Sequence, residues 1–337
     1  MLEAIFRLGQ VLDMLKFFAN RWTCLVVIST GVAAFLTSCS QPAEKAGEGD
    51  PKASAGGSGK LQVTTTVNMV SDLVRQVGGE HIEVTEIMGL GVDPHLYKAS
   101  ANDVTKLQNA EIIFYVGLLL EGKMEEVLGK LRDGGKPVYA VTQGLDSKTL
   151  LDSDEYEDHF DPHVWFDVAI WMQTVDVVVA GLSKAEPDHK SDYEANGKAT
   201  KEKMSALQTW AVDKVNELPV EKRLLVTSHD AYNYFGRAYN FKVVGLQGIS
   251  TVSEAGLADR TKLVDFIKRQ KVKSIFVETT VNPDPIKAVA SDAGVTIGGE
   301  LFSDAMGELG QMEGELDLGT YEGMIKHNIS TIVNALR

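Results

Sequence analysis

From residue 61 onward, short runs of apolar and β-branched residues alternate with stretches whose apolar residues recur at helical spacing. In the first half of this region the runs predict strands at 61–67, 82–87, 111–116 and 137–141, and the stretches between them predict helices at 69–78, 100–109 and 121–132. Ser100 and Asp103 resemble a capping box at the second helix. Strands that alternate with helices predict a parallel sheet covered on both faces.

The second half of the chain repeats this alternation. Its runs predict strands at 224–227, 242–245, 274–278 and 295–297, and its periodic stretches predict helices at 231–239, 254–270, 283–293 and 320–336. The chain is therefore expected to be an α/β protein with two lobes of similar topology, an N-terminal lobe at 61–186 and a C-terminal lobe at 218–337.

A polar segment rich in Lys, Glu and Ala separates the two lobes at 187–217. Pro187 suits a first helical turn, Pro219 would end the helix, and no proline lies between them. A helix of about 30 residues at about 1.5 Å each would reach roughly 45 Å, long enough to run along both lobes. One long linking helix favours small tilting motions over a wide hinge.

The first 38 residues have the features of a secretory signal peptide. Lys16 and Arg21 precede an apolar run at 24–36 that is short for a membrane span. The run leads into Leu36-Thr37-Ser38-Cys39, which resembles the lipobox of bacterial lipoproteins, in which the cysteine is lipidated and becomes the new N-terminus. An uncleaved anchor helix is the alternative. Both interpretations predict an exported protein held at a membrane, on its periplasmic or cell-surface side.

Residues 39–60 are expected to form the lipidated cysteine and a flexible tether, because 40–60 contains Gly, Ala, Ser, Pro and charges but no large apolar residue. Both cysteines of the chain, Cys24 and Cys39, precede this tether, so the folded region has no thiolate to bind a metal. The 47 acidic against 33 basic residues give a net charge of -14, which argues against nucleic acid as a partner.

Four side chains are expected to meet at the carboxyl ends of the predicted strands. His95 follows the second strand, His163 follows the fourth, His229 follows the first strand of the second half, and Asp304 follows its last strand. Ligands bind at this edge in open parallel sheets. Imidazole and carboxylate suit a divalent transition metal, and four donors complete a tetrahedral shell. A single Asp-Pro-His is weak support, because Asp-Pro also marks turns, but this chain has two such segments.

Other polar residues near these strand ends have less certain roles. Asp161 could orient the imidazole of His163 or form a turn, and Glu278 and Glu300 are reserve carboxylates. His159 ends the acidic run at 152–158, which could gather cations near the site or simply be a solvated loop. The remaining histidines are assigned surface or packing roles: His81, His189 and His327.

Several segments between residues 61 and 337 resemble the substrate-binding lipoproteins of bacterial zinc/manganese ABC importers, some of which carry iron. The most specific segments are VDPHLY, DPHVWFD, TSHDAYNYFGRAYNF, LQGISTVSEAG, GGELFSDAMG and GTYEGMIKHNISTIVNAL. The resemblance implies two (β/α)4 lobes joined by one long helix, with one metal ion in the interlobe cleft. It also implies the ligands His95, His163, His229 and Asp304, a monomeric protein, and delivery to an ABC permease with a cytoplasmic ATPase.

The resemblance leaves the metal open between zinc and manganese, with iron third. Members that favour manganese commonly have a glutamate where this chain has His229, whereas many zinc carriers have a long His-rich acidic loop that is short here. Two other functions remain alternatives. A secreted metallohydrolase would keep one zinc position for water, and no HExxH motif occurs. A surface adhesin with the same fold would fit the membrane tether.

Overall fold

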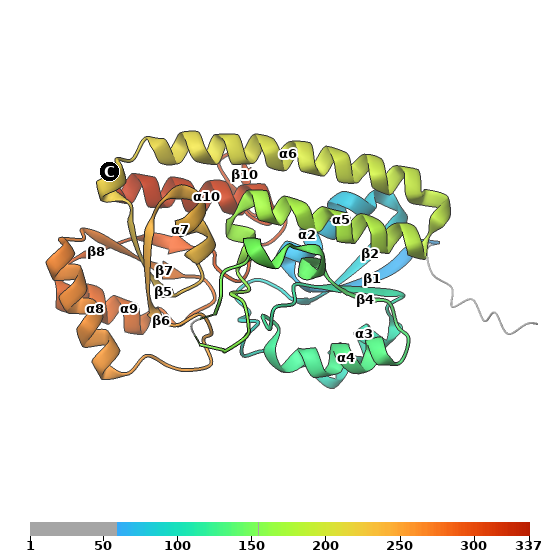
Figure 1. Ribbon diagram of the computed structural model, residues 1–337, viewed down its shortest axis with the longest axis horizontal. Coiled ribbons are helices and arrows are strands. Elements are labelled where there is room, and N and C mark those ends of the chain that lie inside the picture. Colours follow the sequence, from blue (N-terminus) through green and yellow to red (C-terminus); the bar gives the residue numbers. More distant parts are fainter. Residues whose placement is uncertain (1–58, 154) are drawn as a thin grey trace, which may run out of the picture. The chain divides into compact units, whose positions relative to one another are not determined.

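The computed structural model describes residues 59–153 and 155–337 (Figure 1). The predicted signal peptide, the lipidation site Cys39 and the tether up to residue 58 lie outside the described residues. The N-terminal lobe contains a four-stranded parallel sheet in the order β2-β1-β3-β4. Its strands are β1 (Leu61–Val67), β2 (Ile82–Met88), β3 (Ile112–Tyr115) and β4 (Val138–Ala140).

Four helices belong to this lobe: α2 (Asn68–Gly78), α3 (Ala101–Asn109), α4 (Glu125–Asp133) and α5 (Val168–Ala185). The capping box at α3 forms as predicted, since the Ser100 hydroxyl accepts from the Asp103 amide and the Asp103 carboxylate accepts from the Ser100 amide. Sequence patterning did not find α5. This helix packs against α2, α6 and the sheet, and its exposed face includes Ala169 and Ala180 beside Gln173 and Asp176, so the sequence shows little contrast between its faces.

The C-terminal lobe contains two parallel strand pairs. β5 (Leu224–His229) pairs with β6 (Lys242–Gln247), β7 (Ser274–Glu278) pairs with β8 (Thr296–Leu301), and β5 lies beside β7. The helices are α7 (Asn233–Tyr239), α8 (Leu257–Gln270), α9 (Asp284–Ala293) and α10 (Tyr321–Leu336). A short antiparallel hairpin, β9 (Met312–Glu313) and β10 (Leu316–Asp317), precedes α10. The predicted α/β class with two parallel-sheet lobes is confirmed.

The polar segment between the lobes forms a single turn, η6 (Pro187–His189), followed by the 27-residue helix α6 (Lys190–Asn216). At about 1.5 Å per residue α6 spans about 40 Å. It packs on α2 and α5 of the first lobe and on α10 of the second (Figure 1). At Gly197 an added Cβ would lie 2.5 Å from a Val179 methyl carbon, so glycine permits the close packing of α6 on α5.

The larger of two hydrophobic cores runs through the N-terminal lobe, across the interlobe region and into the packing around α10, and the smaller one lies between strands β5, β6 and β7 and helices α8 and α9 of the C-terminal lobe. Direct hydrogen bonds cross the same region. Trp165 donates its indole N–H to the Ser303 carbonyl at 3.0 Å, and Asn68 exchanges two hydrogen bonds with the Met306 backbone at 2.9 and 3.0 Å. The lobes are therefore packed as one unit around the segment that carries Asp304, and a wide opening would expose apolar surface.

Candidate metal centre

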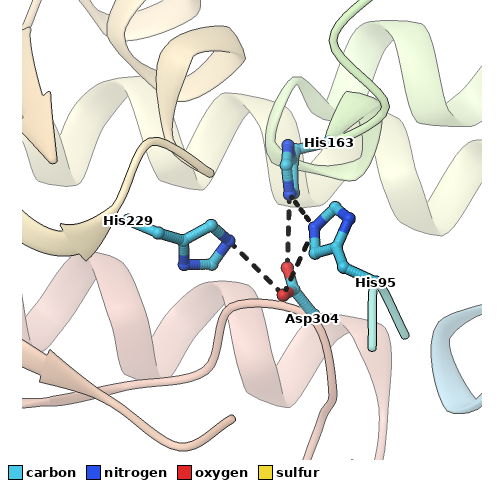
Figure 2. A group of neighbouring side chains, drawn as sticks. All are labelled: His95, His163, His229 and Asp304. Carbon is cyan, nitrogen blue, oxygen red and sulfur yellow. Dashed lines mark hydrogen bonds and ion pairs between the residues drawn. The ribbon is translucent and has the colours of Figure 1, made fainter. Parts of the chain in front are cut away.

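The side chains of His95, His163, His229 and Asp304 converge between the lobes, two from each lobe (Figure 2). Their donor atoms all lie within 4.8 Å of one another, and each residue is buried. Asp304 Oδ1 lies 3.4 Å from His163 Nε2, and Asp304 Oδ2 lies 3.4 Å from His229 Nε2 and 3.8 Å from His95 Nε2. The two N-terminal imidazoles approach each other at 3.3 Å between their Nε2 atoms.

These separations match the spacing of donors around a small cation. Donors about 2.1 Å from a tetrahedral ion lie about 3.4 Å apart. Moreover, His229 Nε2 and both carboxylate oxygens of Asp304 are buried without a hydrogen-bond partner. A buried polar atom without a partner costs roughly 1–3 kcal/mol. Their convergence fits a site that a cation completes.

The loop after β2 holds His95 through Asp93. One Asp93 oxygen accepts from the His95 amide at 2.9 Å, which is the local turn that an Asp-Pro segment favours. The other oxygen accepts from the Thr251 hydroxyl of the C-terminal lobe at 2.6 Å. The position of His95 is thus tied to both lobes.

Asp161 orients His163, which precedes the single turn η5 (Val164–Phe166). Asp161 Oδ1 accepts from the His163 amide at 2.9 Å and lies 2.7 Å from its Nδ1. This contact holds the proton on Nδ1 and leaves Nε2 facing the cluster. Asn233 and Tyr234 of the C-terminal lobe hold Asp161 in turn, at 3.1 Å to Oδ2 and 2.9 Å to the carbonyl. The sequence analysis did not identify Asn233 and Tyr234 as partners of Asp161, because nothing near Asn233 indicates a contact with a residue 72 positions away.

His229 is the last residue of β5, and Glu278 at the end of the adjacent strand β7 orients it. The two Glu278 oxygens lie 2.9 Å from the His229 amide and 2.5 Å from its Nδ1. Glu278 is buried and contacts the side of the imidazole that faces away from Asp304. The structure thus places Glu278, predicted as a reserve carboxylate, as a partner of His229 and outside the group of four.

Glu300 does not reach the cluster, which corrects its prediction as a reserve carboxylate. In the parallel pair of β7 and β8, Glu278 opposes Leu301 and Val277 opposes Glu300. Successive side chains of a strand point to opposite faces, so Glu300 points away from the face that Glu278 uses. It is exposed, and its carbonyl accepts from His327 at 3.1 Å.

A cavity of about 260 Å³ lies against the cluster. Its lining includes His95, Leu119, His159 and the uncharged Ser153 and Tyr156 of the acidic run, whereas none of the run's described carboxylates lines it. His159 itself is exposed and contacts the Glu157 carbonyl through Nδ1 at 2.7 Å. It takes no part in the group of four.

One wall of this cavity is a turn whose role the sequence did not reveal. Leu118 and Leu119 both have positive φ, 56° and 66°, which is unfavourable for side chains with a Cβ. The buried carboxylate of Glu121 holds the turn by accepting from the amides of Val116 and Gly117 at 2.7 and 3.1 Å. Burial raises the pKa of Glu121 to about 7, although these hydrogen bonds oppose the shift. A single glutamate after three leucines gives no periodic signal.

The electrostatics of the cluster favour an ionised Asp304. Burial would raise the pKa of this carboxyl, but His229 and His163 hold it well below its usual range. Burial lowers the pKa of His95 to about 3. For His163 burial also lowers the pKa, but Asp161 and Asp304 outweigh it and raise the pKa to about 9. The site thus attracts positive charge, which a proton on His163 or a metal ion can supply.

Comparisons with known proteins agree along most of the chain. The family model of zinc-uptake complex component A, periplasmic, matches residues 63–335. The manganese-binding lipoprotein MntA of Bacillus subtilis (strain 168) is 46% identical over 283 residues, which cover 82% of this chain and 90% of that protein. The zinc-binding protein TroA of Treponema pallidum (strain Nichols) is 44% identical over 287 residues, which cover 84% of this chain and 91% of that protein. The solved structure of the periplasmic zinc-binding protein TroA from Treponema pallidum has a TM-score of 0.78 at 43% identity and covers 82% of this chain and 99% of that one.

Proposed function

Because the chain belongs to the family of zinc-uptake complex component A, we propose that it captures a zinc or manganese ion outside the cytoplasm and delivers it to an ABC importer. One observation carries the capture step. Three buried polar atoms, His229 Nε2 and both Asp304 oxygens, have no hydrogen-bond partner and face two further imidazoles. A divalent cation would satisfy all three at once.

In this proposal His95, His163, His229 and Asp304 bind the ion. Asp161 and Glu278 are positioning residues, because each contacts the Nδ1 of a histidine and leaves Nε2 toward the cluster. Four protein donors leave no position for an activated water, which argues against a hydrolase. The family itself consists of solute-binding transport proteins.

The donor set favours zinc over manganese in affinity. Imidazole is a good ligand for zinc, and the Irving-Williams order places zinc well above manganese. Nevertheless, both oxygens of Asp304 are unpartnered, so the carboxylate could bind through both and give a manganese ion a larger shell. Iron remains a third cargo by the same reasoning. The transported metal is then decided by availability as well as by affinity.

Delivery requires the protein to remain near the permease. We infer that the mature chain is a monomer anchored by a lipid on Cys39, in keeping with the lipoprotein relatives. Since the lobes share one core under α6, metal binding and release should involve a small tilt of the lobes. Small-angle scattering of metal-free and metal-bound protein should therefore give nearly equal radii of gyration.

The decisive experiment is calorimetric titration of the metal-free chain that lacks residues 1–38 and carries Cys39→Ser, with zinc and with manganese under a competing chelator. We expect one tight equivalent that His163→Ala abolishes. His327→Ala is the matched control, because His327 also contacts a carboxylate, Glu313 at 2.5 Å, but lies outside the cluster. Tight binding that survives His163→Ala, or no stoichiometric binding of either metal, would overturn the proposed site.

A further inference from the structure

A second group of potential metal ligands lies at the start of the linking helix. Among the described residues, only two groups of three or more His, Cys, Asp or Glu side chains bring their donor atoms within 4.8 Å, and the second consists of His81, His189 and Asp192. His81 ends the single turn η1 (Gly79–His81), which connects α2 to β2. His189 is the N-cap of α6, and Asp192 lies in its first turn. The group lies at the end of α6 that packs on the N-terminal lobe (Figure 1).

The three side chains share one carboxylate oxygen. Asp192 Oδ2 lies 3.0 Å from His81 Nε2 and 4.0 Å from His189 Nδ1. The two imidazoles stack with ring centroids 3.9 Å apart and an angle of 20° between their planes. Two protonated rings stacked this closely would repel each other, so the arrangement favours at least one neutral imidazole, the form that binds metals.

The turn η1 and the start of α6 hold the backbones of all three residues close together. The spacing of three between His189 and Asp192 places both on one face of the first turn of the helix. Tyr193 is buried behind the group, with its ring edge-on to both imidazoles, and its hydroxyl donates to Glu186 at 2.6 Å. The side chains of His81, His189 and Asp192 remain 20%, 42% and 54% exposed, so water can reach an ion there and complete its shell.

From this geometry we propose that His81, His189 and Asp192 form a second, surface zinc site that ties the first turn of α6 to the N-terminal lobe. Two imidazoles and one carboxylate, with water in the remaining positions, suit zinc and bind manganese poorly. The site is weaker than the cleft site, because it has three protein donors and its ligands are partly exposed. Ring stacking alone brings the two imidazoles together in the structure, so binding one ion requires the more exposed ring of His189 to turn out of the stack until its nitrogen points at the ion that His81 and Asp192 share.

The test is zinc titration of the Cys39→Ser chain lacking residues 1–38, since this substitution removes the remaining thiol that could bind zinc. We expect two zinc equivalents but a single manganese equivalent. His81→Ala and His189→Ala should each abolish the weaker zinc equivalent and leave the affinity of the tighter one within about twofold, as expected for distant, independent sites. His327→Ala should retain both equivalents.

Asp192→Asn provides a variant of the same size, in case an alanine variant unfolds; it should weaken only the second equivalent. The proposal is overturned if the parent Cys39→Ser chain binds only the tight zinc equivalent, or if the weaker equivalent persists in both histidine variants. It is independent of the proposed function. If the parent Cys39→Ser chain binds only the weak zinc equivalent and no tight one, the cleft site is refuted and the second site is not.

Discussion

Replacement of Glu278 by glutamine should weaken metal binding without removing any of the four donors. In the structure the two carboxylate oxygens of Glu278 face two N–H groups of the same residue, the amide of His229 at 2.9 Å and its Nδ1 at 2.5 Å. Glutamine has one oxygen and one NH2 group. Whichever way the amide is turned, one of these two N–H groups loses its acceptor.

Both orientations lead to a loss. If the NH2 group faces Nδ1, the imidazole of His229 must accept there and carry its proton on Nε2, the nitrogen that should bind the metal. If the NH2 group faces the backbone N–H of His229 instead, that buried N–H is left without an acceptor, which costs about 1–3 kcal/mol. Loss of such orienting partners typically lowers metal affinity by about 10- to 100-fold, or about 1.4–2.7 kcal/mol.

The assay is competition for zinc between the protein and a chromophoric chelator. The matched control is Glu300→Gln, which makes the same change on the neighbouring strand at an exposed position outside the cluster. We expect a 10- to 100-fold loss for Glu278→Gln and none for Glu300→Gln. Unchanged affinity in Glu278→Gln, or an equal loss in both variants, would refute the assignment of Glu278 as the residue that sets the tautomer of His229.

Three further results are expected. Zinc affinity should rise with pH from about 6 to about 9, because Asp304 with Asp161 or Glu278 raises the pKa values of His163 and His229, and the metal must displace the proton that each then holds; titrations at several pH values that give a flat profile would contradict this. Glu121→Ala should lower the free energy of unfolding in urea by about 2–4 kcal/mol, since the buried amides of Val116 and Gly117 lose their acceptor, and a loss below about 1 kcal/mol would speak against that role. Ser100→Ala should cost about 1 kcal/mol in the same assay through loss of the α3 cap, with no change in zinc affinity.

The parts of the fold that the sequence predicts well are the continuous strand runs of apolar and β-branched residues and the polar helix that prolines bound at both ends. Strands β1 and β7 have the predicted bounds, and α6 begins and ends within three residues of the predicted segment. Helix α5 was missed because its exposed face includes Ala169 and Ala180, which reduces the contrast between its faces in the sequence. In β8 the prediction stopped at 297, but the strand continues to Leu301, since pairing with β7 sustains a strand through Gly298 and Gly299 that local preference alone would end.

The candidate site shows the same division between local and tertiary information. The rule that ligands gather at the carboxyl ends of parallel strands predicts that His95, His163, His229 and Asp304 lie together, and the structure brings their donor atoms within 4.8 Å of one another. It could not separate Glu278 from Glu300, because both lie near the ends of adjacent strands and only the register of β7 with β8 decides which one faces the site.

The contacts around the cluster support the small tilt proposed for metal release. Each lobe supplies two of the four side chains, and partners from the opposite lobe hold the residues behind them: Thr251 bonds Asp93 at 2.6 Å, and Asn233 bonds Asp161 at 3.1 Å. A tilt of about 1 Å at the cleft would break these bonds and lengthen the metal contacts from both lobes together. In the proposed mechanism, release therefore needs no unfolding of the core, and a permease that separates the lobes slightly would lower the affinity for the ion sharply.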